Sequence, residues 1–92
     1  GCAKVSDQAV KAIVESIEGS EHLEKLKLSF GECSSLTNQG IKYIEGYLTR
    51  SRGLRHVEIN FNDCPGVSAE QLQSLKEVGS SIEYLSISGR NP

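Results

Sequence analysis

Apolar and polar residues follow a short strand-like pattern and then a helix-like one in the middle of the chain. Over residues 57–61 apolar side chains stand at alternate positions, which is typical of a strand with one buried face. Pro65-Gly66 then predicts a tight turn. Ser68 with Gln71 matches a helix capping box, and from Leu72 onward the apolar positions follow the helical period. The pattern therefore predicts a strand, a turn and a helix in succession.

The same succession stands 31 positions earlier. Residues 26–30 alternate in the same way, Thr37 is the capping residue, and Ile41 and Ile44 follow the helical period. An earlier copy shows only the helix, and the last copy shows only the strand. We therefore expect one domain, residues 1–92, made of copies at residues 1–22, 23–53, 54–81 and 82–92.

Three cysteines share this spacing, at positions 2, 33 and 64. They form no CxxC pair and have no histidine cluster beside them, so neither a disulfide framework nor a zinc site is indicated. Because the neighbours of each cysteine recur with it, the spacing indicates a structural role at a repeated corner. We expect this role for Cys2, Cys33 and Cys64.

These segments resemble leucine-rich repeats of the cysteine-containing, ribonuclease-inhibitor-like subclass. The resemblance is carried by Leu54-x-x-Val57-x-Ile59 followed by Cys64-x-x-Val67-Ser68, and by Leu23-x-x-Leu26-x-Leu28 followed by Cys33-x-x-Leu36-Thr37. It implies an α/β solenoid of about three repeats, with a parallel β-sheet on the concave side and α-helices on the convex side. It also implies that the cysteines stack at the corner and bond free backbone groups. The chain departs from the family by two extra residues before each cysteine, near Phe30 and Phe61.

Composition excludes several classes of partner. The formal net charge is −2, with 24% charged residues and no block of five like charges, so neither nucleic acid nor an anionic membrane is indicated. No apolar run reaches the length of a membrane helix, and no secretory signal pattern is present, so we expect no membrane insertion. We expect an intracellular, reducing location, with the mitochondrion as one such compartment.

The outward positions of the predicted strands form a candidate binding face. Parallel strands about 4.8 Å apart would align these side chains in rows and place Lys27 beside Glu58. The three rows are Lys25, His56 and Tyr84; Lys27, Glu58 and Ser86; and Ser29, Asn60 and Ser88.

We expect a non-catalytic module that binds another protein through this face, without a cofactor or metal, because no nucleotide-binding, metalloprotease or nucleophile-elbow motif is present. An enzyme using Lys25, His56 and Tyr84 is the alternative from another class. Family analogy adds two alternatives, which are the substrate-receptor repeats of an F-box ubiquitin-ligase adaptor and a mitochondrial assembly or coupling subunit resembling factor B of the ATP synthase. The strand from Ile82 to Ile87 would form an uncapped sheet edge, and three alternatives follow for it: further repeats were removed, the edge docks on a partner, or it self-associates with a second copy.

Overall fold

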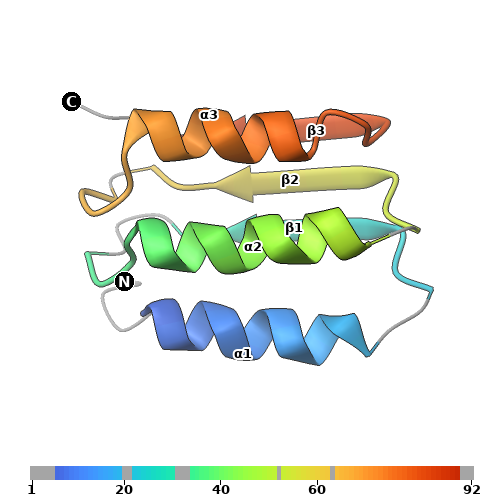
Figure 1. The fold of residues 1–92 in the computed structure, drawn as a ribbon, viewed down its shortest axis with the longest axis horizontal. Coiled ribbons are helices and arrows are strands. Elements are labelled where there is room, and N and C mark those ends of the chain that lie inside the picture. The colour runs from blue at the N-terminus through green and yellow to red at the C-terminus, as the bar shows by residue number, and fades with distance from the viewer. Residues whose placement is uncertain (1–5, 20–21, 31–33, 52, 63, 90–92) are drawn as a thin grey trace.

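Helices and strands alternate along the chain (Figure 1). The computed structural model describes residues 6–19, 22–30, 34–51, 53–62 and 64–89. Its elements are α1 (Asp7–Glu18), β1 (Lys25–Ser29), α2 (Asn38–Arg50), β2 (His56–Asn60), α3 (Ala69–Val78) and β3 (Tyr84–Ser88). The caps expected at Thr37 and Ser68 are confirmed, and Ser6 caps α1 in the same way. The side chain of each accepts a hydrogen bond from a backbone N–H group of the first turn.

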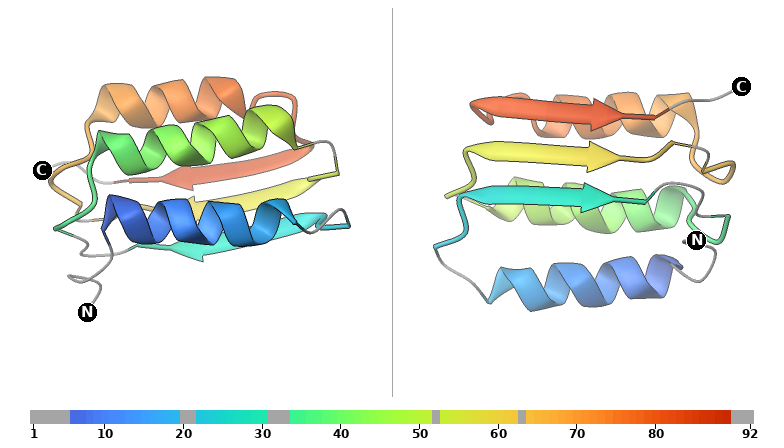
Figure 2. Two further views of the ribbon diagram at one scale, coloured as in Figure 1. Left: turned by 60° about the horizontal axis from the view of Figure 1, so that its bottom comes forward. Right: turned by 180° about the vertical axis from the view of Figure 1, so that it is seen from behind.

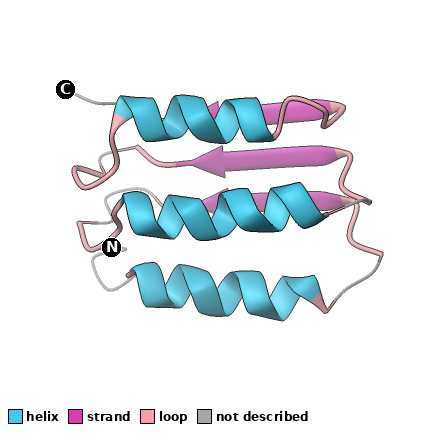
Figure 3. Cartoon of the chain, in the orientation of Figure 1, coloured by secondary structure: helices cyan, strands magenta, loops and turns pink. Residues whose placement is uncertain are grey.

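The three strands form one parallel sheet in the order β1-β2-β3, and all three helices lie on the same side of it (Figures 2 and 3). This confirms the predicted α/β class with a parallel sheet. The register pairs Lys25 with His56 and His56 with Tyr84, so the side-chain rows expected from the sequence spacing are correct. Because successive side chains of a strand point to opposite faces, the register also aligns the inward residues Leu26, Val57 and Leu85.

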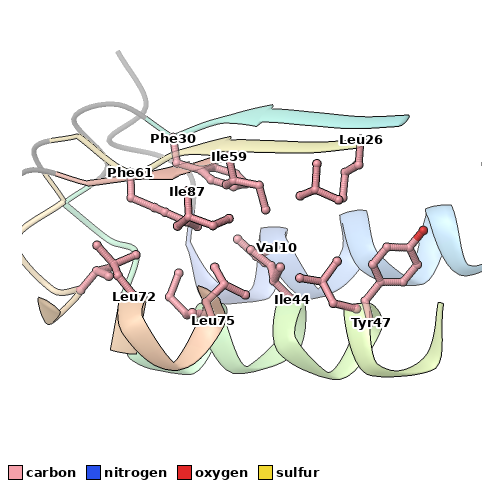
Figure 4. Close-up of a cluster of buried hydrophobic side chains, with 14 of the residues drawn as sticks. Val10, Leu26, Phe30, Ile44, Tyr47, Ile59, Phe61, Leu72, Leu75 and Ile87 are labelled. Carbon is pink, nitrogen blue, oxygen red and sulfur yellow. The ribbon is translucent and has the colours of Figure 1, made fainter. Parts of the chain in front are cut away.

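The space between the sheet and the helices is filled by one hydrophobic cluster (Figure 4). Phe30 and Phe61 follow directly after β1 and β2, where the sequence is longer than the family pattern, and are only 4% and 2% exposed. Their rings stack with centroids 5.6 Å apart. The added length therefore continues the inward face of each strand by one buried aromatic residue, worth about 1.5–3 kcal/mol of hydrophobic burial per ring.

The corner after β2 is closed by Cys64. The residue is 2% exposed, and its Sγ lies 2.8 Å from the carbonyl oxygen of Phe30, in the preceding repeat. Gly66 forms a bridge with Thr37, and a Cβ at Gly66 would lie 2.4 Å from the carbonyl oxygen of Leu36. Consecutive corners thus approach closely enough to require glycine there. Cys2 and Cys33 lie outside the described residues, so the stacking of all three cysteines remains a prediction.

The helix N-termini are tied together by the side chain that follows each cap. Asp7 accepts from the backbone N–H groups of Thr37, at 2.8 Å, and Gly40, at 3.0 Å, and from the Thr37 hydroxyl. Asn38, 31 positions later, accepts from the backbone N–H of Ser68 at 2.9 Å. We call these bonds the N-terminal ladder. They satisfy donors that a helix start leaves free, and they link each helix to the next.

The capping box expected at Ser68 is formed only in part. The Ser68 hydroxyl accepts from the backbone N–H of Gln71 at 3.1 Å, as predicted. The Gln71 side chain instead donates to Glu45 of α2 at 3.0 Å. The reciprocal bond predicted for Gln71 is therefore wrong, because Asn38 already occupies the Ser68 backbone N–H.

Removing the N-terminal ladder should destabilise the fold. We expect Asp7→Ala to lower the free energy of unfolding by about 2 kcal/mol and Asn38→Ala by about 1 kcal/mol, because they remove several bonds and one bond respectively. Urea unfolding measures both. Gln8→Ala, at an exposed neighbour on α1, is the control and should stay within about 0.5 kcal/mol of the parent. An Asp7→Ala effect no larger than that of Gln8→Ala would show that the ladder does not stabilise the fold.

Candidate functional site on the open sheet face

No described helix covers the face of the sheet opposite α1, α2 and α3 (Figure 2). Strand alternation and register place all nine predicted site residues on this open face. The side chains of β1 on this face are exposed, and those of β2 are half-buried because they have a strand on each side. The predicted set is therefore brought together as three rows across the strands.

The first row is organised by an aromatic stack. The ring of His56 lies parallel to the ring of Tyr84, with centroids 4.3 Å apart and planes 8° apart. Tyr84 is nevertheless 49% exposed, so one side of its ring remains open to solvent. Lys25 is the register partner of His56 on β1. The row thus presents a cation, an imidazole and a fixed phenol ring.

The second row is organised by the carboxylate of Glu58. Nε2 of His56 lies 3.0 Å from one carboxylate oxygen, and Nζ of Lys27 lies 3.5 Å from the other. The hydrogen bond from His56 lowers the pKa of Glu58 most, and the charge of Lys27 lowers it further, while partial desolvation opposes both. Glu58 is therefore ionised at neutral pH and held between two partners.

The third row lines the open end of the face. Asn60 is partly engaged within the chain, because its side-chain oxygen accepts from the backbone N–H of Asn62 at 2.8 Å. This bond fixes the turn that leaves β2. A shallow hollow of about 310 Å³ lies across this row and the second one, and it is lined by Lys27, Leu28, Ser29, Glu58, Ile59, Asn60, Ser86 and Ser88.

Three contacts on or beside the face were missed by the sequence reasoning, and the first is the stack of His56 on Tyr84. Another is the contact between His56 and Glu58, which stand two residues apart on one strand and therefore share a face. This two-residue spacing could have indicated the contact. Arg55 forms an ion pair with Glu83 at 3.0 Å beside the first row, where both side chains are 67% exposed. The register places these two residues one step before His56 and Tyr84, so their pairing could have been read from the same spacing. The exposed pair contributes less than about 1 kcal/mol.

The chemistry of this face suits recognition by hydrogen bonds, charge and ring stacking. Within the described residues, no group of three or more His, Cys, Asp or Glu side chains is placed to hold a metal ion. None of the helices in the described part of the chain is long and apolar enough to cross a membrane.

Comparison with known proteins gives this chain no relative, since no family model, curated protein or solved structure matches it. Its function must therefore be inferred from the residues themselves.

The ionisation of Glu58 offers a direct test of the network. We expect an NMR titration of the Glu58 carboxyl to give a pKa below the ordinary value of 4.5. His56→Ala should raise this pKa more than Lys27→Ala does, because the hydrogen bond from His56 is the larger cause. A lowered pKa stabilises the fold at pH values above 4.5, and this contribution is lost as pH falls through the folded-state pKa. Equal, negligible shifts in both variants would contradict the network.

Proposed function

We propose that this chain is a short leucine-rich-repeat solenoid that binds another protein through the open sheet face, which is its concave side. The observation that carries the proposal is the exposure of Tyr84. Among the described residues it is the one large hydrophobic side chain that is exposed, and it stands on the face that no helix covers. Tyrosine is among the residue types that most often anchor protein interfaces.

The face is preorganised for binding. The stack on His56 holds the Tyr84 ring, and Glu58 holds the imidazole of His56 in turn. Side chains that are already ordered lose little conformational entropy when a partner docks. The strands beneath are fixed by backbone hydrogen bonds, so the three rows keep their spacing. These features favour a rigid recognition surface over a surface that folds on binding.

The charges of the face favour a partner with an acidic group near β1. The Lys27 side chain is 72% exposed, although it reaches Glu58, and Lys25 beside it is also exposed. The carboxylate of Glu58 already has two partners, a hydrogen bond with His56 and an ion pair with Lys27. The β1 side of the face is therefore positive, and the β3 side is uncharged, with Tyr84 as its anchor. We expect the partner to place a carboxylate over β1 and an apolar group against Tyr84.

Site-specific photocrosslinking tests the position of the interface. A photoreactive residue at Ser86, on the open face, should capture one defined protein from an extract of the source cells. The same residue at Gln73, exposed on α3 on the opposite side, is the matched control and should not capture it. Capture at Gln73 alone would move the interface to the helical side.

Affinity measurements with the captured protein then test the anchor. We expect Tyr84→Ala to raise the dissociation constant about tenfold, because a central aromatic anchor is removed. Glu58→Lys should weaken it as well, by breaking the support of His56 and reversing a charge. Gln73→Ala is the control. The melting temperature of Tyr84→Ala should stay close to the parent, because Tyr84 lies outside the hydrophobic core. Glu58→Lys should lower the melting temperature slightly, because it replaces the ion pair with Lys27 by a like-charge pair. Unchanged affinity in both variants would contradict binding through the open sheet face.

A further inference from the structure

The two ends of the described fold each lack the half of a repeat that the other end carries. At the first end α1 packs against α2, and no described strand lies beyond β1 for α1 to cover (Figure 1). At the last end β3 is followed by no described helix. A helix without its strand and a strand without its helix are complementary parts.

Apolar surface remains partly open at these same two ends. Of the eight partly buried hydrophobic residues around the core, four lie at the first end and three at the last. Ile13 and Ile17 of α1 belong to this set, whereas their equivalents 31 positions later, Ile44 and Leu48, are 1% and 6% exposed. Ile44 and Leu48 are buried because the neighbouring repeat of the same chain covers them. The end residues at the first end are Ile13, Ile17, Leu23 and Leu28, and those at the last end are Val78, Ile82 and Leu85.

The outer edge of β3 is ready to pair. The N–H of Tyr84 donates to Arg55 at 3.0 Å and the carbonyl of Ser88 accepts from Phe61 at 2.7 Å, so alternate residues of β3 face β2. The backbone groups of Leu85 and Ile87 therefore point away from the sheet. The strand contains no charged residue and no proline, the usual protections of an edge strand.

The outer edge of β1 matches it. The carbonyl of Glu24 accepts from His56 at 3.1 Å and the N–H of Phe30 donates to Asn60 at 2.7 Å, so the backbone groups of Lys25, Lys27 and Ser29 point outward. These residues are the register equivalents of His56, Glu58 and Asn60, through which β2 pairs with β1. A parallel strand beside β1 would thus find the same arrangement of donors and acceptors that exists inside the sheet.

We propose that β3 of one copy of this chain pairs in parallel with β1 of a second copy, with Tyr84 beside Lys25 and Ser86 beside Lys27. The α1 helix of the second copy then lies where a helix following β3 would lie, and it covers the open side of Leu85. This head-to-tail junction between two molecules reproduces the strand pairing between successive repeats within one chain. The occupant is a second copy because the described chain carries both edges, and the outward backbone groups of β1 match those of β3 in register.

Side chains at this junction are compatible. Lys25 of the second copy reaches the ring face of Tyr84 that His56 leaves open, where a cation is attracted by the aromatic ring. Lys27 of the second copy meets the hydroxyl of Ser86, and no like charges oppose each other in these two pairs. The junction uses the Tyr84 ring and the Lys25 side chain, which the proposed partner interface also uses, so the two contacts compete.

Charge substitutions at Ser86 test the junction in the purified 92-residue chain, without any partner protein. Sedimentation at increasing concentration should show head-to-tail association of the parent. Ser86→Lys should weaken it about two- to fivefold by facing Lys27 of the next copy, and Ser86→Glu should strengthen it by a similar factor. Thr49→Lys and Thr49→Glu, on the exposed side of the central helix, are the controls for net charge. Melting at low concentration verifies that each variant is folded.

The junction is supported if Ser86→Lys weakens association and Ser86→Glu strengthens it. If β3 paired with β3 of another copy in an antiparallel dimer, Ser86 would face its own equivalent, and both variants would weaken association. That result overturns the head-to-tail arrangement. A parent chain that remains monomeric at every concentration overturns self-association altogether.

Discussion

Parallel pairing of three strands in one register is the constraint on which the rest of this structure depends. It places His56 between Lys25 and Tyr84, and it fixes which side chains enter the core. A slip by one residue would exchange the buried and open faces of a strand. The corners reinforce the register, because Cys64 reaches the carbonyl of Phe30 across neighbouring copies. The candidate site and the core are thus two consequences of the same alignment.

Much of this alignment could be predicted from the sequence, because it rests on periodicity. Alternation at residues 26–30 and 57–61 and their 31-residue spacing predict the α/β class and the first two members of each row. The third members follow 28 residues after the second, where the alternation of Leu85 and Ile87 predicts the last strand. The hydrogen bonds of individual polar side chains could not be predicted in this way. Gln71 turns to Glu45 because Asn38 already bonds the cap, and Asp7 reaches across to Thr37. These choices depend on neighbours in space that a one-dimensional pattern does not specify.

The same distinction applies to the open face. The rows were predicted, but the support of Tyr84 by His56, and of His56 by Glu58, was not. A row gives only the order of residues across the strands, whereas the stack and the hydrogen bond depend on side-chain rotamers. This support makes Glu58 a structural part of the face, because its charge is already satisfied by His56 and Lys27. The exposed ring of Tyr84 and the lysines of β1 are then the groups with most capacity left for a partner.

The unequal charge of the two sheet edges bears on how copies associate. An antiparallel pair of β1 strands centred on Lys27 would oppose like charges, which disfavours contact between two β1 edges. The β3 edge has no charge to disfavour contact with itself, but a pair of β3 strands would leave Ile13 and Ile17 of both copies partly open. Pairing of β3 with β1 avoids the lysine repulsion and covers both apolar ends. Charge and hydrophobic burial therefore both favour the proposed pairing of β3 with β1 over pairing of like edges.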